Sequence, residues 1–272
     1  MTAEEKKQIY SLLKTVADWS YGCPAPGFDI MPPEFCDDEI PEDSPSQTNS
    51  SDSILNVIAA KISNCNRCQL CKTRTNTVPG MGVENPAVLV IVEGPGADED
   101  ASGLPFVGKA GQLLDKMLAA ISLSRTSNCY IANIVKCRPP ANRDPLPEES
   151  EACASYLSAQ IAALKPKMIL ALGRVAIQNL LQTTDGIGKL RGYFHDYKGI
   201  PLLATYHPSA LLRNPDLKRP AWEDLKIFRD RLNILSPDYD IPFKAEQKSH
   251  FYVYTLNSSS IVSTLNITIT IV

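Results

Sequence analysis

The chain has 272 residues, of which 44% are hydrophobic and 21% charged, and its formal net charge is -3. This length suits one substantial core plus extensions, and the composition is that of an ordinary globular protein. No apolar run reaches the roughly 18 residues that a membrane span needs, and the N-terminus lacks a signal pattern, so we expect a cytoplasmic protein.

Charge is divided unevenly along the chain. Residues 1–53 carry 3 Lys and 11 Asp or Glu, whereas residues 54–236 carry 22 Lys or Arg and 16 Asp or Glu. A basic middle behind an acidic arm allows the middle to bind phosphates, although the net charge is negative.

Composition and periodicity divide the chain into four parts. Residues 1–22 have apolar positions at helical intervals, and residues 23–53 have the Pro, Ser and acidic composition of a linker. Residues 54–236 form the main domain, whose first helix has capping candidates just before it. Residues 237–272 form a tail of unknown role, largely uncharged and β-branched at its end, which suits either an added strand pair or an aggregation-prone segment.

Four short apolar runs alternate with helical patterns in the main domain. The runs are Ala87–Val92, Tyr130–Val135, Met168–Leu172 and Leu202–Tyr206. The helical patterns lie near 109–121, 147–163, 173–182 and 220–235. This alternation predicts a three-layer α/β/α domain with a central, mainly parallel four-stranded sheet.

Polar, Gly-rich and Pro-rich residues directly follow each predicted strand. These segments are Glu93–Gly96, Lys136–Pro139, Gly173-Arg174 and His207–Ser209. Ligands of open α/β sheets bind outside the carboxyl ends of the strands, so we expect the functional site at this rim.

Eight cysteines without an export signal favour metal or redox chemistry over disulfides. Cys65, Cys68 and Cys71 lie close together, and Cys137 and Cys153 flank a Pro-rich loop. Thiolates at such spacing suit a zinc ion or an iron–sulfur cluster, and spacing alone selects neither the metal nor the four ligands.

Three segments resemble the family-4 (thermostable-type) uracil-DNA glycosylases. They are EGPGADEDASGLPFVGKAGQLL at Glu93–Leu114, ANIVKCRPP at Ala132–Pro140 and HPSALLRNP at His207–Pro215. The resemblance covers about residues 60–232, with the motifs in the family's order. One departure is Val92, where the family pattern has glycine.

The resemblance implies a [4Fe–4S] cluster with a structural role. The positions that match the family's ligands are Cys65, Cys68, Cys137 and Cys153. Cys71 is then a spare thiol.

Three side chains match the family's base-recognition residues. Phe106 would stack on a uracil flipped out of the DNA, and the amide of Asn133 would donate to O4 and accept from N3–H. His207 would donate a hydrogen bond to uracil O2 as negative charge develops there, and a neutral imidazole suffices for this.

Glu93 is the best candidate for positioning the attacking water or stabilising the cationic sugar. The backbone N–H groups of Gly94 and Gly96 would contact the base or nearby phosphates. We assign Glu99 and Asp100 only a helix-capping role.

DNA contacts are expected from the third motif. Ser209 and Arg213 would bind the phosphates that flank the flipped nucleotide, and Leu211 or Leu212 would enter the vacated stack, with Leu211 the first choice. No lysine takes a nucleophile's place in the motifs, which predicts a monofunctional glycosylase.

The sequence therefore predicts a monomeric, nucleoid-associated enzyme that releases uracil from single- or double-stranded DNA. One alternative is the superfamily's covalently trapping variant, but its basic insertion and its first-motif glutamine are absent from this sequence. The other alternative is a DNA-binding module without catalysis.

Overall fold

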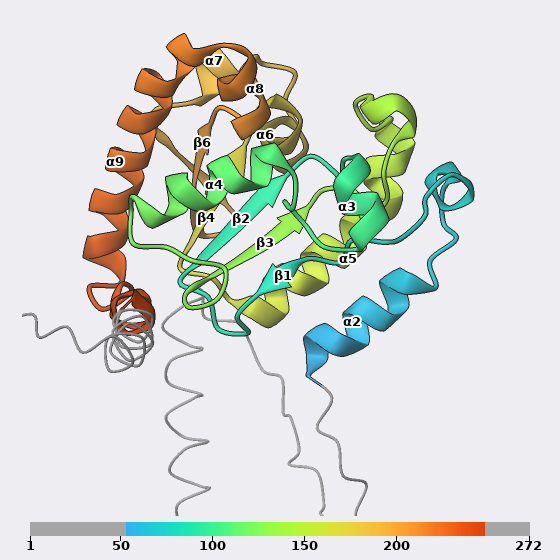
Figure 1. Cartoon of the computed structure of the whole chain (residues 1–272), viewed down its shortest axis with the longest axis horizontal. Helices are drawn as coiled ribbons and strands as arrows, with labels where there is room; N and C mark the ends of the chain where they lie inside the picture. The colour runs from blue at the N-terminus through green and yellow to red at the C-terminus, as the bar shows by residue number, and fades with distance from the viewer. Residues whose placement is uncertain (1–52, 248–272) are drawn as a thin grey trace, which may run out of the picture. The chain divides into compact units, whose positions relative to one another are not determined.

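The computed structural model describes residues 53–247 (Figure 1). The predicted helix over 1–22, the linker up to residue 52 and the tail from 248 onward lie outside the described residues. The elements, in chain order, are α2 (Ile54–Ser63), η1 (Gln69–Lys72), β1 (Met81–Gly82), β2 (Val88–Val92), α3 (Ala97–Ser102), α4 (Lys109–Ala119), β3 (Cys129–Asn133), η2 (Pro140–Asn142), α5 (Pro147–Leu164), β4 (Met168–Leu172), α6 (Arg174–Leu181), α7 (Ile187–Leu190), β5 (Phe194–Tyr197), β6 (Ile200–Thr205), α8 (Pro208–Arg213), η3 (Pro215–Leu217) and α9 (Lys218–Leu235).

The sheet has six strands in the order β1-β3-β2-β4-β6-β5. The four predicted strands form its parallel centre, and the prediction of a mainly parallel α/β sheet is confirmed. The count of four strands was too low, because β1 and β5 add antiparallel edges. Neither edge strand has the continuous apolar run by which the central strands were found: β1 has only two residues, and β5 reads FHDY.

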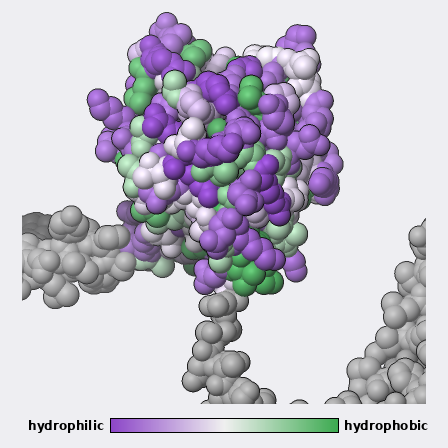
Figure 2. Space-filling view, turned by 90° about the vertical axis from the view of Figure 1, so that its right-hand side faces the viewer, coloured by the Kyte–Doolittle hydropathy of each residue, from purple (hydrophilic) through white to green (hydrophobic). Residues whose placement is uncertain are grey.

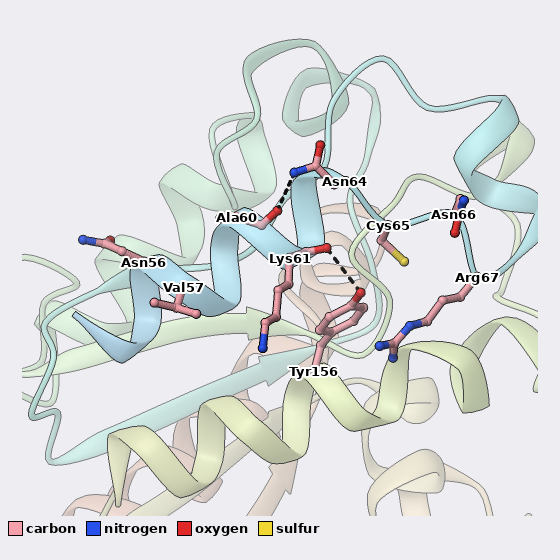
Figure 3. A pocket seen from close by; sticks show the side chains of 9 residues that line it. All are labelled: Asn56, Val57, Ala60, Lys61, Asn64, Cys65, Asn66, Arg67 and Tyr156. Carbon is pink, nitrogen blue, oxygen red and sulfur yellow. Dashed lines mark hydrogen bonds between the residues drawn. The ribbon is translucent and has the colours of Figure 1, made fainter. Parts of the chain in front are cut away.

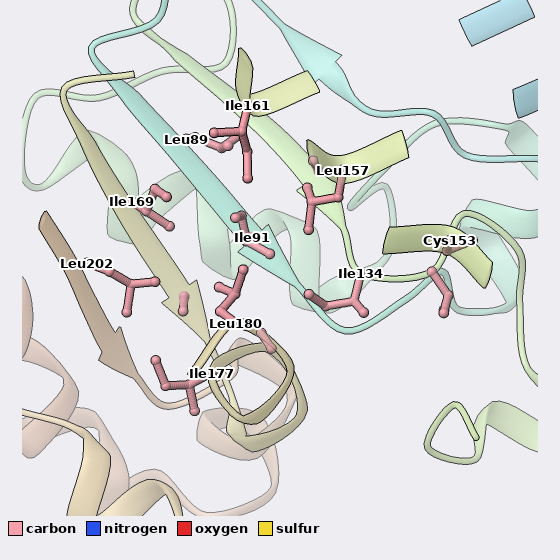
Figure 4. Close-up of a cluster of buried hydrophobic side chains, with 14 of the residues drawn as sticks. Leu89, Ile91, Ile134, Cys153, Leu157, Ile161, Ile169, Ile177, Leu180 and Leu202 are labelled. Atoms are coloured by element: carbon pink, nitrogen blue, oxygen red, sulfur yellow. The ribbon is translucent and has the colours of Figure 1, made fainter. Parts of the chain in front are cut away.

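Helices cover both faces of the sheet, which confirms the three-layer arrangement. One face packs against α5, α6 and α7, where Leu157, Ile161 and Ile177 meet Leu89 and Ile91 of β2 (Figure 4). The other face packs against α4 and α9 through a second apolar cluster. Burying a leucine or isoleucine side chain stabilises a fold by about 1.5–3 kcal/mol, so these two interfaces hold the layers together.

The strand order also fixes where a ligand can bind. The chain leaves β2 toward α4 on one face of the sheet and leaves the neighbouring β4 toward α6 on the other face. Connections that diverge from adjacent parallel strands open a crevice at their carboxyl ends. Glu93 and Gly173, the first residues after these strands, therefore lie at that crevice.

Hydrogen bonds stabilise the chain near both ends of the described residues. Ser53 caps α2, since its hydroxyl accepts a hydrogen bond from the backbone N–H of Leu55 at 3.3 Å. At the other end, Tyr239 is buried, and its hydroxyl donates to the carbonyl of Ile121 at 2.9 Å. The packed chain thus extends at least three residues beyond the predicted domain end at 236.

Val92, the departure from the family pattern, is accommodated as the last residue of β2. Its side chain is buried in the second apolar cluster, and its φ is not positive. A glycine is therefore not required at this position.

The surface of the described residues carries both hydrophilic and apolar side chains. On the face drawn in Figure 2, hydrophilic side chains predominate and apolar ones lie in small separate groups. No helix within residues 53–247 is both long and apolar enough to cross a membrane.

Candidate active site

A cavity of about 510 Å³ lies at the carboxyl ends of the parallel strands. Of the nine residues predicted for catalysis and substrate binding, eight line it: Glu93, Gly94, Gly96, Phe106, Asn133, His207, Ser209 and Arg213. They come from segments that follow different strands, so only the folded chain brings them together. Leu211 is the exception.

Phe106 is held in a strained loop against this cavity. Its φ is 56°, a left-handed value that costs a non-glycine residue about 1–3 kcal/mol, so other contacts must enforce it. Arg125 donates to the carbonyls of Pro105 at 2.7 Å and of Phe106 at 3.3 Å, and it forms an ion pair with Asp115. The Phe106 ring centroid lies 5.7 Å from that of His207.

Gly111 allows the Phe106 loop to lie directly on α4. A Cβ atom at this glycine would lie 2.0 Å from the carbonyl oxygen of Phe106, a distance that no side chain tolerates. The second glycine of the motif's LPFVGKAG segment is therefore required by close backbone packing.

Glu99 joins the two halves of the first motif, a role beyond the predicted capping. One carboxylate oxygen accepts from the N–H of Gly96 at 3.1 Å. The other accepts from the N–H groups of Val107 at 3.0 Å and Gly108 at 3.3 Å. The carboxylate thus fixes the turn after β2 relative to the Phe106 loop.

Asn133 is the last residue of β3, and only 2% of its surface is exposed. The parallel register pairs it with Val92, which places it beside the Glu93 turn. No hydrogen bond of the described residues engages its side-chain amide, which lines the cavity. The amide atoms are not among the sealed polar atoms of the described residues that lack a partner, so they face the cavity and are available to a ligand.

His207 presents a single N–H to the cavity. It caps α8, where its Nδ1 accepts from the backbone N–H of Ser209 at 3.1 Å and lies 2.7 Å from the Ser209 hydroxyl. Because Nδ1 accepts, the proton of the neutral ring is on Nε2. Burial, with a smaller effect of the Arg213 charge, lowers the pKa of His207 to about 4, so the ring is neutral at physiological pH.

Gly173 leaves room for this imidazole. Its φ of +91° suits glycine, and a Cβ atom there would lie 3.0 Å from the Cβ of His207.

Glu93 lies in a carboxyl pair that sequence reasoning missed. Its side chain hydrogen-bonds Asp144, which in turn forms an ion pair with Arg174. Burial, together with the negative charge of Asp144, raises the pKa of Glu93 to about 7, although Arg174 opposes this. Asp144 and Arg174 both line the cavity; Arg174 directly follows a predicted strand, whereas Asp144 lies in the loop before α5 and gave no such signal.

The predicted choice of Leu211 as the DNA wedge is wrong. Leu211 is 2% exposed and packs into the protein, whereas its neighbour Leu212 is 48% exposed. Adjacent residues of a helix point in different directions, and here the fold turns Leu211 inward. Leu212 is the leucine of α8 that is free to contact DNA.

Five cysteines gather near the start of α5. Cys65, Cys68 and Cys71 are half-buried, Cys137 and Cys153 are buried, and none of the described cysteines forms a disulfide. Cys137 and Cys153 belong to one apolar cluster, and Cys68 packs against it. Within residues 53–247, no group of three or more His, Cys, Asp or Glu is arranged to hold a single metal ion.

Hydrogen-bond donors point at the sulfur atoms. Arg74 donates to Cys137 Sγ at 3.1 Å, and the Cys153 thiol accepts from the backbone of Lys136. Cys65 faces an open groove beside Tyr156 and Arg67, whose guanidinium carbon lies 4.5 Å from the Tyr156 ring centroid (Figure 3).

Comparison with known proteins agrees with this geometry. Residues 79–226 match the family description "Uracil DNA glycosylase superfamily", and the chain belongs to that superfamily. A type-4 uracil-DNA glycosylase of Archaeoglobus fulgidus is 43% identical over 180 residues, which cover 63% of this chain and 90% of the relative. Those of Pyrobaculum aerophilum (43% over 177 residues, 61% and 89%) and Saccharolobus solfataricus (39% over 187 residues, 66% and 87%) match similarly. Within the superfamily, this chain is a member of the type-4 uracil-DNA glycosylases.

Proposed function

We propose that this glycosylase hydrolyses the bond between uracil and deoxyribose in DNA, releases uracil and leaves an abasic site. The observation that carries the proposal is that one cavity gathers an aromatic ring, an unpaired amide, a neutral imidazole and a carboxyl: Phe106, Asn133, His207 and Glu93. Such a set meets the separate demands of binding, recognising and expelling a flipped base.

Phe106 and Asn133 provide recognition in this proposal. The aromatic ring stacks on the face of the base, and the amide of Asn133 donates to uracil O4 and accepts from N3–H. Cytosine presents a donor and an acceptor in the reverse order, so it would leave the buried amide unsatisfied. The contacts of Arg125 and Gly111 that hold the Phe106 loop support a pre-formed stacking platform.

His207 stabilises the leaving group. As the glycosidic bond breaks, negative charge develops on uracil O2, and the Nε2–H of His207 donates to that oxygen. The lowered pKa supports a neutral donor, which needs no protonation before reaction.

Glu93 acts on the sugar side of the bond. As a carboxylate it orients the attacking water or stabilises the cationic sugar. Asp144 and Arg174 position this carboxyl through the hydrogen bond and ion pair described above. Gly94 and Gly96 line the same edge of the cavity; the N–H of Gly94 would contact the base or a phosphate, whereas that of Gly96 already donates to Glu99.

DNA is held by the third motif. Ser209 and Arg213 line the cavity mouth and bind flanking phosphates, and Leu212 enters the gap left by the flipped nucleotide. No lysine is among the described residues that line the cavity, which supports a monofunctional glycosylase that does not cut the strand. Uracil in single- or double-stranded DNA fits this arrangement, with the protein as a monomer.

The group of five cysteines fits an iron–sulfur cluster. Soft sulfur ligands suit such a cluster, and Arg74 donates to Cys137 Sγ at 3.1 Å, which supports sulfur ligation at this place. Cys65, Cys68, Cys137 and Cys153 would hold it, and Cys71 would remain free. Bound there, the cluster would supply a structural link between the loop before η1, the turn after β3 and the start of α5.

An excision assay tests the activity and its competitors. A labelled oligonucleotide with one uracil is incubated with wild type, with the Asn133→Ala, His207→Ala double variant, and with Asn85→Ala as an exposed-asparagine control. Alkali then cleaves any abasic site. We expect turnover with wild type and control, and a loss of at least about 100-fold in the double variant. One covalent adduct per molecule would instead indicate trapping, and binding without cleavage would indicate a non-catalytic module.

Iron and sulfide analysis tests the cluster. We expect about four of each per chain in protein purified without oxygen. Cys153→Ser is expected to lose the metal, whereas Cys71→Ser is expected to keep it.

A further inference from the structure

Lys136 is a buried lysine that the chemistry above does not use. Its side chain is 1% exposed, and it does not line the cavity. Its Nζ donates to the backbone carbonyl of Asn133 and to Oε1 of Gln160 on α5, both at 2.7 Å. Gln160 in turn donates from Nε2 to the carbonyl of Pro79 at 2.7 Å.

These bonds hold the peptide that carries Asn133 from one side, while the sheet holds it from the other. The N–H of Ile134 donates to Val92 at 2.7 Å, and that of Val135 donates to Glu93 at 3.1 Å. The turn after β3 is thus fixed between the Glu93 turn and α5. A displacement of Asn133 would require these contacts to break.

The choice of lysine at this position is costly. A fully buried amine loses its hydration, so its N–H groups must find acceptors inside the protein. Both its charged and neutral forms retain at least two N–H groups, enough for the carbonyl of Asn133 and the amide of Gln160. An apolar side chain of similar length would fill the space but would leave both acceptors unpaired.

We propose that Lys136 is a positioning residue that fixes the Asn133 amide in the orientation that distinguishes uracil from cytosine. The inference rests on the proposed role of Asn133 as the residue that recognises uracil. The main-chain N–H of Lys136 also donates to the Cys153 thiol, so the same turn joins base recognition to the thiol centre.

A double-mutant cycle tests this dependence. Lys136→Met, Asn133→Ala and the double variant are compared with wild type for single-turnover excision of uracil. Lys167→Met, which removes an exposed lysine, is the charge-matched control. Iron content and thermal unfolding are measured for every variant, so that a general loss of structure is recognised.

We expect Lys136→Met to lower kcat/KM for uracil by about 10- to 100-fold in the wild-type background. In the Asn133→Ala background the same change should cost less than about threefold, because the amide that it positions is absent. An equal loss in both backgrounds, or no loss in either, would overturn the proposal.

Two additions keep the test decisive. If Lys136→Met does not fold, Gln160→Leu removes the other acceptor and is carried through the same cycle, with the same expected dependence on Asn133. If wild type binds uracil DNA without cleaving it, the proposed function fails, and the cycle is then measured as the ratio of Kd values for uracil- and cytosine-containing oligonucleotides. A ratio that Lys136→Met leaves unchanged refutes the positioning role.

Discussion

The ionised carboxylate of Glu93 is expected to promote uracil excision and to lower the stability of the fold, and the variant Glu93→Gln tests both effects. The substitution preserves the size of the side chain and a hydrogen bond to Asp144, because the new amide can donate to that carboxylate. It removes the ionisable group whose pKa is raised from an ordinary 4.5 to about 7 by burial and by Asp144. We expect it to lower uracil excision by about 10²–10⁴-fold, the usual contribution of a positioned acid or base.

The stability effect follows from proton linkage. Between pH 4.5 and about 7 the folded protein holds a proton on Glu93 that the unfolded chain has released, so stability falls as pH rises through this window. The full shift corresponds to about 3 kcal/mol at neutral pH. Solvent in the open cavity screens the charges, which reduces the expected cost to about 1–2 kcal/mol. Glu93→Gln should therefore be more stable than wild type at pH 8 by this amount, and equal to it below about pH 4.5.

Urea unfolding at pH 4, 6 and 8, together with the excision rate at each pH at which the protein is folded, measures both effects. Wild-type excision should decline as pH falls below about 7, whereas the residual rate of Glu93→Gln should not. Glu84→Gln, at an exposed position, is the control and should change neither quantity. A stability difference that is independent of pH, or wild-type excision by Glu93→Gln, would refute the assignment of Glu93.

Three further predictions test the rest of the site. Leu211→Ala should destabilise the fold by about 2–5 kcal/mol, because this side chain is buried. Leu212→Ala should leave stability unchanged and should slow excision from duplex DNA more than from single-stranded DNA. The reverse pattern in melting and excision assays would contradict the exposure of the two leucines. Gly111→Ala should lower both the melting temperature and uracil excision, because its Cβ would lie 2.0 Å from the Phe106 carbonyl oxygen, and an unaffected variant would show that the loop is not strained. His207→Gln, which retains an N–H donor, should keep more activity than His207→Ala, and wild-type pH–rate profiles should show no transition from His207 between pH 5 and 8, since its pKa is about 4.

Local sequence pattern was sufficient for the central architecture. The apolar runs that became β2, β3, β4 and β6 are buried on both faces, so their hydrophobicity is continuous and easily recognised. Because parallel strands share one carboxyl edge, the residues that follow them had to meet there, and eight of the nine predicted site residues line one cavity. The edge strands escaped prediction because such strands are only partly buried and need no continuous apolar run.

Tertiary structure decided the features that depend on burial and on neighbours distant in the chain. The carboxyl pair of Glu93 and Asp144 joins residues on either side of β3, and no local pattern specifies that contact. The inward side chain of Leu211 depends on how α8 is rotated against the core, and the adjacent apolar residues Leu211 and Leu212 leave that rotation open. Lys136 belongs to the polar, Pro-rich segment after a predicted strand, yet the fold buries it, and its Nζ donates to the carbonyl of Asn133 and to Gln160.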